Sequence, residues 1–341
     1  MKEKYLLELG GENTDLGKYE ALELLKFQKY SPFLEKDYES IIVISTSKKI
    51  EKNIIARLSM TKRISRIIFT SNKENVKDIL TDLEEINIED LNFAIRQIGG
   101  KKLESEKTAI LIGEKISTKN ETKLDTPQVT VLFYQNKEFF ISLKHAEIDT
   151  GYKRCLKHHI SNRPYFSPIG IHPRIARAMI NLSNCANDKT LIDPFCGTGG
   201  ILIEGADMGL KVTGIDLKEK MIEFSKGNLK HYGFKANLIN SDFKEISSLE
   251  FGSIVCDPPY GIASTSGGEN IKKLMERSLD VFQKCMENKQ RLVIAVSDFK
   301  ITKSNKKISR QNLKLPKIMA TDDILKQFTE QCPQHCFKIG F

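Results

Sequence analysis

The sequence predicts an α/β protein whose C-terminal half forms a doubly wound parallel sheet, preceded by two smaller α/β modules. Two observations support this fold class. From Pro173 onward, helix-periodic segments alternate with strand-length apolar segments. Such a rhythm is typical of parallel sheets that are covered by helices. Before residue 150, strands also alternate with helices, but the last two strands follow each other through a short polar turn.

Residues 1–70 are predicted to form the first module. Its pattern is β-α-β-α-β, with strands at residues 5–9, 40–45 and 66–70 and helices at residues 14–27 and 48–59. A sheet with one face buried under both helices satisfies this order. We therefore expect a small α/β domain of ferredoxin-like type.

Residues 71–148 are predicted to form the second module. We expect helices at residues 76–85 and 107–116 and strands at residues 91–97, 129–134 and 138–143, the last two joined by the turn 135–137. Arg96 lies in the first of these strands, and Lys101 and Lys102 follow its end. Basic groups in such a place can contact RNA phosphates, or they can simply mark a solvated strand end.

Residues 149–170 are predicted to be a linker, because prolines, glycines and basic residues are concentrated there. Arg154 and Arg163 are candidate RNA contacts in this linker. Cys155, His158 and His159 suggest a metal site, but no second ligand pair has suitable spacing, and the same holds for the cluster near Cys332 and His335. We therefore predict no metal.

Residues 171–341 are predicted to form the parallel-sheet domain. Pro173 suits the first turn of a helix that runs to Leu182. Further helices are expected after Gly199 and at residues 219–231, and strands are expected at residues 190–192, 211–215, 236–239, 253–256 and 291–297.

The composition favours a polyanionic partner. Lys and Arg number 53 against 44 Asp and Glu, which gives a formal net charge of +9. No apolar run approaches the ~18 residues of a membrane helix, and the N-terminus lacks the pattern of a signal peptide. Seven cysteines are scattered along the chain, which fits reduced thiols. We expect a cytoplasmic protein, with a monomer as the default state.

A glycine turn follows the first strand of the parallel-sheet domain. Asp193 ends this strand, and Gly197 and Gly199 lie in the turn that leads into the next helix. Such a turn lets a ligand lie against the backbone, at the edge where open α/β sheets bind ligands. The spacing matches neither a dinucleotide fingerprint nor a P-loop, so hydride transfer and nucleotide hydrolysis are disfavoured.

Acidic residues also end the next two strands. Asp216 can accept hydrogen bonds from both hydroxyls of a ribose, and Asp242 can accept one from an adenine amino group. Each acid alone could be a helix N-cap. Three acids at successive strand ends instead indicate a nucleotide-like cofactor.

The fourth strand ends in the motif Asp257-Pro258-Pro259-Tyr260-Gly261. Because two prolines stiffen this turn, the Asp257 carboxylate and the Pro258 carbonyl become fixed acceptors beside the aromatic ring of Tyr260. Two acceptors can draw an exocyclic amine toward pyramidal geometry and stabilise the charge it gains during attack. Tyr260 would stack on the base.

The motifs DPFCGTGG, GID, NSD and DPPYG occur in an order that resembles S-adenosylmethionine-dependent amino-methyltransferases of Rossmann-like fold. The whole chain resembles the archaeal tRNA guanine-10 N2-methyltransferases, which join a ferredoxin-like domain and a THUMP RNA-binding domain to that catalytic fold. The segments ILIEGADMGLKVTGID, NLKHYGF and RPYFSP are similar to that family, whereas Ile262 departs from it, since Arg more often follows DPPYG.

The resemblance implies a role for each motif. Asp193, Gly197 and Gly199 would line the methionine side of S-adenosylmethionine, with Asp216 at the ribose and Asp242 at the adenine. Phe166 would be an aromatic residue of the linker near the cofactor. Asp257 and Pro258 would hold the target amine, and Tyr260 would contact the base. The implied function is methylation of the N2 amine of a tRNA guanine, once or twice.

Several alternatives remain. The chemistry also suits a related enzyme acting on a different tRNA guanine, or a DNA adenine or protein glutamine methyltransferase. A non-catalytic RNA-binding protein is the alternative from another class. The basic segment 300–317 is either an RNA contact or a solvated loop.

Overall fold

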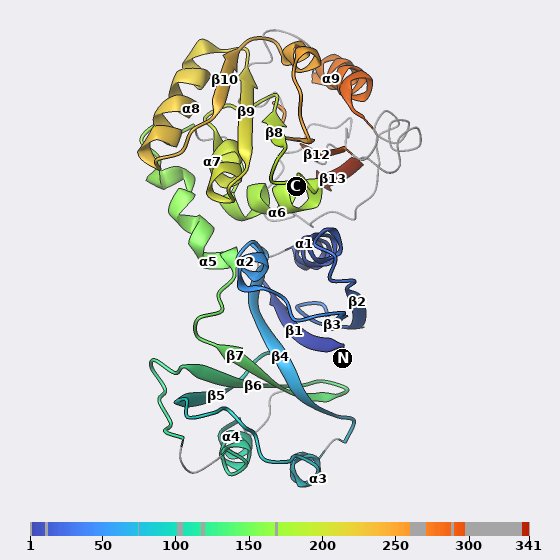
Figure 1. Ribbon diagram of the computed structural model, residues 1–341, viewed down its shortest axis with the longest axis vertical. Coiled ribbons are helices and arrows are strands. Elements are labelled where there is room, and N and C mark those ends of the chain that lie inside the picture. Colours follow the sequence, from blue (N-terminus) through green and yellow to red (C-terminus); the bar gives the residue numbers. More distant parts are fainter. Residues whose placement is uncertain are drawn as a thin grey trace, which may run out of the picture. The chain divides into compact units, whose positions relative to one another are not determined.

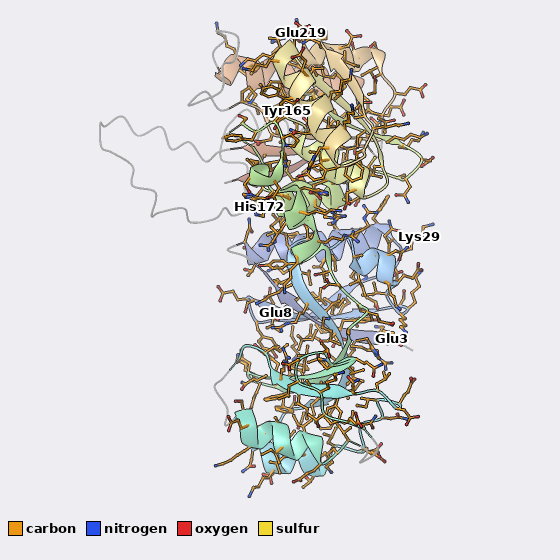
Figure 2. The ribbon with its side chains drawn as sticks, turned by 90° about the vertical axis from the view of Figure 1, so that its left-hand side faces the viewer. Glu3, Glu8, Lys29, Tyr165, His172 and Glu219 are labelled. Atoms are coloured by element: carbon orange, nitrogen blue, oxygen red, sulfur yellow. The ribbon has the colours of Figure 1, made fainter. Side chains whose placement is uncertain are left out.

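The computed structural model describes residues 2–10, 13–73, 75–100, 105–116, 120–167, 170–259, 271–287, 290–296 and 336–340. The chain forms two compact units (Figure 1). The first comprises Met1–Ala56 and Thr61–Gly151, and the second comprises Arg57–Met60 and Tyr152–Phe341. Side chains fill the space between the elements of each unit (Figure 2).

The first unit is built on one seven-stranded sheet of order β2-β3-β1-β4-β7-β6-β5. The described pairs are antiparallel except for β5 and β6, which are parallel. Its elements are β1 (Glu3–Leu9), α1 (Thr14–Phe27), β2 (Phe33–Asp37), β3 (Ile41–Thr46), α2 (Lys52–Ile55), β4 (Thr61–Ser71), α3 (Val76–Thr81), β5 (Phe93–Gln97), α4 (Ser105–Gly113), β6 (Val129–Gln135) and β7 (Phe139–His145).

The first six elements have the order and antiparallel pairing of a ferredoxin-like unit, with one strand more than the sequence indicated. This strand, β2, lies at the sheet edge, and its mostly exposed side chains lack the apolar alternation of a half-buried strand. The helix expected at residues 48–59 is much shorter, since α2 covers only Lys52–Ile55.

The long strand β4 joins the two predicted modules into one sheet. Arg66 of β4 is paired with Tyr5 of β1 on one side and with Leu143 of β7 on the other. Beyond β4, the helices α3 and α4 cover β5, β6 and β7 and enclose an apolar core that includes Ile79 and Ile112. The boundary at residue 70 therefore falls inside a continuous sheet, and a division into two domains remains a prediction.

The second unit holds a six-stranded sheet of order β10-β9-β8-β11-β12-β13, in which every described pair is parallel. Its elements are α5 (Gly151–Arg154), η1 (Cys155–His158), η2 (Ile160–Asn162), α6 (Pro173–Ser183), β8 (Thr190–Asp193), α7 (Gly200–Asp207), β9 (Lys211–Asp216), α8 (Glu219–His231), β10 (Asn237–Asn240), η3 (Phe243–Ser248), β11 (Ser253–Cys256), α9 (Ile271–Cys285), β12 (Arg291–Val296) and β13 (Cys336–Gly340).

Helices cover both faces of this sheet, as the predicted doubly wound fold requires (Figure 1). Neighbouring residues of a strand point to opposite faces. Ile192 of β8 joins a core with Phe282 of α9, whereas Leu191 lies near Gly205 of α7 together with Ile180 of α6. The strand order reverses between β8 and β11, and open α/β sheets bind ligands at the carboxyl ends beside such a point.

The predicted linker is not an extended spacer. It forms the helical turns α5, η1 and η2, and all but its first residues belong to the second unit. Cys155 and His158 are buried within it. Among the described helices, none is long and apolar enough to cross a membrane.

Candidate functional site

Four aspartates mark the carboxyl ends of four adjacent strands. Asp193 and Asp216 are the last residues of β8 and β9, Asp257 directly follows β11, and Asp242 comes two residues after β10. The strands are parallel, so these ends meet at one edge of the sheet. The structure therefore brings together the four acids that the sequence singled out.

Asp193 lies deepest in this cluster. Its side chain is buried, and Oδ1 accepts a hydrogen bond of 3.0 Å from the backbone N–H of Phe195. Burial raises the pKa of Asp193 well above its ordinary value, and the nearby charges of Asp257 and Asp216 raise it further. Because negative charge accumulates here, a cationic ligand would be stabilised at this edge.

Asp216 holds the glycine turn in place. Its Oδ2 accepts from the N–H of Gly197 at 3.0 Å, and its Oδ1 accepts from the N–H of Lys218 at 2.9 Å. Burial raises the pKa of Asp216, partly offset by these two bonds. Each carboxylate oxygen has a second lone pair. Asp216 therefore retains the capacity to accept hydrogen bonds from two hydroxyls, and its contact with a ribose stays a prediction.

Both predicted turn glycines adopt left-handed backbone conformations. The φ angle of Gly197 is 51° and that of Gly199 is 84°, values that L-residues avoid. A Cβ at Gly199 would lie 2.6 Å from Ser225 Oγ, whereas a Cβ at Gly197 would meet no atom of the described residues within 4 Å. Gly199 is thus required for packing, and the backbone at Gly197 faces open space.

Asp242 has a partner that the sequence did not indicate. Arg277 Nη1 of α9 lies 3.2 Å from both of its carboxylate oxygens, and the guanidinium stacks over the ring of Phe243 at 4.4 Å. Asp242 also caps η3 by accepting from the N–H of Lys244. Helix α9 escaped prediction, although Leu274, Ser278 and Phe282 follow one another at helical spacing.

The motif at the end of β11 is described as far as Pro259. Asp257 is half-buried and Pro258 is buried, beside the end of β8 where the strand order reverses. Tyr260, the predicted contact of the base, lies outside the described residues. Burial raises the pKa of the Cys256 thiol well above its ordinary value, so this neighbour of Asp257 is not a nucleophile at neutral pH.

The glycine turn is linked to the segment around Phe166. Asn228 of α8 donates from Nδ2 to the carbonyls of Tyr165 at 2.7 Å and Thr198 at 3.0 Å, and its Oδ1 accepts from the N–H of Tyr165. The Tyr165 ring, labelled in Figure 2, stacks on Phe224 of α8 with ring centroids 5.0 Å apart. Phe166, next in the chain, exposes 62% of its surface.

The predicted RNA contacts lie in different environments. Arg96 is exposed on β5, with Nη2 donating to the Leu124 carbonyl, and Arg154 is exposed at the end of α5. Lys101 and Lys102 lie outside the described residues, as does the basic segment 300–317. Arg163, in contrast, is only 5% exposed. The buried guanidinium therefore does not present a surface cation to RNA phosphates, contrary to the exposed position expected for this residue, and its RNA contact stays a prediction.

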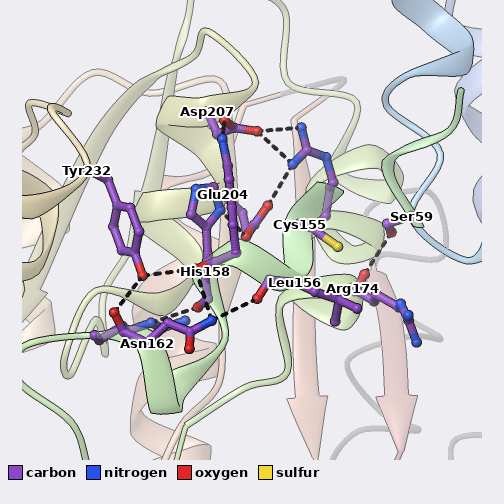
Figure 3. A network of polar contacts seen from close by, with 12 residues as sticks. Ser59, Cys155, Leu156, His158, Asn162, Arg174, Glu204, Asp207 and Tyr232 are labelled. Carbon is purple, nitrogen blue, oxygen red and sulfur yellow. Dashed lines mark hydrogen bonds and ion pairs between the residues drawn. The ribbon is translucent and has the colours of Figure 1, made fainter. Parts of the chain in front are cut away.

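A buried ionic network anchors the linker to α7 (Figure 3). His158 Nδ1 lies 2.7 Å from Glu204 Oε1, and Arg177 donates to Glu204 at 2.7 Å and to Asp207 at 2.9 Å. His158, Glu204 and Asp207 are close enough to share a metal ion. However, the Arg177 guanidinium already bridges both carboxylates, so this cluster does not support a metal site. Sequence reasoning missed it, because the partners are far apart in the chain.

The site suits S-adenosylmethionine on three observations. The side of Gly197 is open, so a group can lie against the turn. The raised pKa of Asp193 marks an acidic cluster that a sulfonium or ammonium would stabilise. Phe166 presents an exposed apolar ring on the segment tied to the turn by Asn228. These residues fit the predicted cofactor.

Comparison with known proteins gives a consistent result. Residues 161–319 match the family of RMKL-like methyltransferase domains. The chain is 32% identical over 245 residues to the tRNA (guanine(10)-N2)-dimethyltransferase of Methanothermobacter thermautotrophicus. This alignment covers 70% of this chain and 72% of that protein. The corresponding protein of Pyrococcus abyssi is 31% identical, covering 78% and 80%. A tRNA (guanine(6)-N2)-methyltransferase of Archaeoglobus fulgidus is 23% identical, covering 70% of each chain.

Proposed function

Because the chain belongs to the tRNA (guanine(10)-N2)-dimethyltransferase family, we propose that it methylates the exocyclic N2 amine of guanine 10 in tRNA, using S-adenosylmethionine. The observation that carries this proposal is the row of four strand-end aspartates beside an open glycine turn, in a chain that shares most of its length with these relatives.

Each strand end has a proposed part in binding the cofactor. The backbone at Gly197 and the acidic group of Asp193 contact the methionine portion, and Asp216 accepts bonds from the ribose hydroxyls. Asp242, held by Arg277, accepts a bond from the adenine amino group. When bound, S-adenosylmethionine supplies an electrophilic methyl group on a sulfonium.

Asp257 and Pro258 act on the guanine amine. Its lone pair is delocalised into the ring, so the free amine is a weak nucleophile. The Asp257 carboxylate and the Pro258 carbonyl would accept hydrogen bonds from its two N–H groups. They would stabilise the positive charge that develops on the nitrogen as the N–C bond forms and the S–C bond to the methyl group breaks, with S-adenosylhomocysteine as the leaving group. The proton then passes to Asp257 or to water. Since a guanine in a tRNA stem is stacked, the base must leave the helix to reach these acceptors.

The first unit is proposed to bind the tRNA by shape and phosphate contact. Arg96 in the first unit and Arg154 in the second are exposed cations that we propose for such contacts, and the net charge of +9 favours a polyanion. We also propose that the chain acts as a monomer in the cytoplasm. Light scattering of the purified protein, with and without tRNA, tests the monomer.

The test of function is methylation of unmodified tRNA transcripts with labelled S-adenosylmethionine, followed by nucleoside analysis. We expect N2-methylated guanosine, and no label in a transcript whose guanine 10 is replaced by adenine. The similarity to a guanine-6 enzyme makes another target the second candidate. Label that persists in the substituted transcript would establish that candidate, and the ratio of products shows whether one or two methyl groups are added.

Asp257→Ala tests the chemistry. It should reduce turnover by at least about 100-fold, in the range found when a group that stabilises transition-state charge is removed, and leave the cofactor Kd nearly unchanged. Asp280→Ala is the matched control, because Asp280 is an exposed acid on α9 paired only with Lys284 among the described residues. Normal turnover of Asp257→Ala would contradict the assignment.

A further inference from the structure

Arg163 is the feature of the second unit that the proposed function leaves unexplained. It is 5% exposed, and its Nε donates to the His158 carbonyl at 3.0 Å. Nη1 and Nη2 are buried, and no described residue accepts a hydrogen bond from either of them. Burial lowers the pKa of this guanidinium. Burying a guanidinium whose two terminal nitrogens lack acceptors among the described residues is costly, because the charged group loses its hydration without full compensation.

The free end of Arg163 lies against the start of α7. The position of a Cβ at Gly200 would be 3.2 Å from Nη1 and 3.6 Å from Nη2. Gly200 is the first residue of α7 and directly follows the glycine turn, so any larger residue would crowd the guanidinium. The absence of a side chain at position 200 therefore keeps Arg163 next to the turn that we propose binds the cofactor.

The N-terminus of α7 adds positive potential at the same place. No side chain caps it, and its first turn contains no acidic residue. The first N–H groups of a helix lack partners within the helix, and their dipoles favour an anion. The charge of Glu204 lies near Arg163, but its two oxygens are engaged by His158 and Arg177. The Arg163 guanidinium and the N-terminus of α7 thus create positive potential at one place, where no described anion accepts hydrogen bonds from Nη1 or Nη2.

We propose that Arg163, together with the N-terminus of α7, binds the carboxylate of the methionine portion of S-adenosylmethionine. This inference rests on the proposed function, and it assigns the part of the cofactor that the acidic strand ends cannot hold. Acidic residues attract the sulfonium and the ammonium, whereas the carboxylate requires donors. A guanidinium offers two parallel N–H groups that match the two oxygens of a carboxylate.

The test compares two ligands by calorimetry. S-adenosylmethionine and its decarboxylated form share the sulfonium, the ribose and the adenine and differ in the carboxylate. The wild-type protein should prefer the complete cofactor by about 10- to 100-fold, the range for charge-assisted hydrogen bonds. Arg163→Met should lose that preference, binding the complete cofactor about 10- to 100-fold more weakly and the decarboxylated form nearly as well as before. Arg163→Lys should retain part of the preference.

Arg174→Met is the matched control. Arg174 also donates from Nε to a carbonyl of the linker, that of Tyr152 at 2.8 Å, but its guanidinium stacks on the Tyr152 ring. This variant should retain the wild-type preference between the ligands.

Other results would overturn the proposal. A wild-type protein that binds both ligands equally has no carboxylate subsite, whether or not Arg163→Met folds. If Arg163→Met binds both ligands more weakly by the same factor, Arg163 has a structural role. If this variant binds only tRNA more weakly, Arg163 contacts RNA, as the sequence predicted. Failure of the wild-type protein to bind either ligand would refute the proposed function itself.

Discussion

Gly197→Ala tests whether the cofactor lies against the glycine turn, because it changes both the stability of the ligand-free protein and the room for a ligand at Gly197. The φ angle of 51° costs an alanine about 1–2 kcal/mol. The added Cβ would touch no atom of the described residues, so no clash with them adds to that cost. If the methionine portion of the cofactor lies on this face, the methyl group intrudes upon it. Overpacking of this kind costs about 1–3 kcal/mol, which weakens binding roughly 5- to 150-fold.

Gly209→Ala is the control for this variant. Gly209 follows α7 with a φ angle of 82°, and in the described part of the chain no atom lies within 4 Å of a Cβ there. Both variants should therefore lose similar stability in thermal unfolding without ligand, about 2–8 °C in Tm for a unit of this size. Only Gly197→Ala should weaken S-adenosylmethionine binding in calorimetry. Equal Kd values for the two variants would refute the placement of the cofactor at Gly197.

Three further predictions concern buried and paired charges. Asp193→Asn should raise the ligand-free stability at pH 7 by about 0.5–2 kcal/mol, since burial raises the pKa of Asp193 and penalises its ionised form. The same variant should bind the cofactor more weakly. Its stability advantage should shrink as the pH falls and vanish below about 3, under the ordinary pKa of Asp, where the wild-type carboxyl is neutral in both the folded and the unfolded state. A pH-independent advantage in chemical denaturation would contradict this cause. Arg177→Met should destabilise the protein by about 3–5 kcal/mol, because it leaves Glu204 and Asp207 without their shared cation. Adding Glu204→Gln should recover part of that loss, and no recovery in urea unfolding would mean that the charge pair is not its source. Arg277→Met should weaken cofactor binding, because it releases Asp242 from its fixed orientation. It should leave unchanged the pH dependence of the unfolding free energy that we attribute to Asp193. An unchanged Kd for the cofactor would show that Asp242 needs no such support.

The ionic network of the linker gives these predictions a structural context. Arg177 and His158 hold Glu204 on α7, and α7 begins at the glycine turn. A linker anchored in this way positions both Phe166 and Arg163 relative to the turn. The proposed cofactor site therefore draws on the linker as well as on the sheet, and this part of the chain belongs to the second unit.

The sequence by itself determined the parallel sheet of the second unit and the acids at its edge. Short apolar strands ending in Asp193, Asp216 and Asp257 are local patterns, and a doubly wound order brings the ends of such strands to one edge. The limits of α8, Glu219–His231, also follow from local periodicity. The family resemblance rests on the same motifs and is supported by the relatives found.

Only the tertiary structure decided which distant side chains meet. Two ion pairs join segments that are remote in sequence: Arg277 with Asp242, and Arg177 with Glu204. The burial of Arg163 likewise depends on how the elements around it pack. In the first unit, β4 continues one sheet across the predicted boundary at residue 70. Local sequence reports helical or strand periodicity and the ends of elements, because neighbours in the chain share one backbone. Whether a basic residue faces RNA, a carboxylate or the interior depends on packing between elements, and that is set by the fold as a whole.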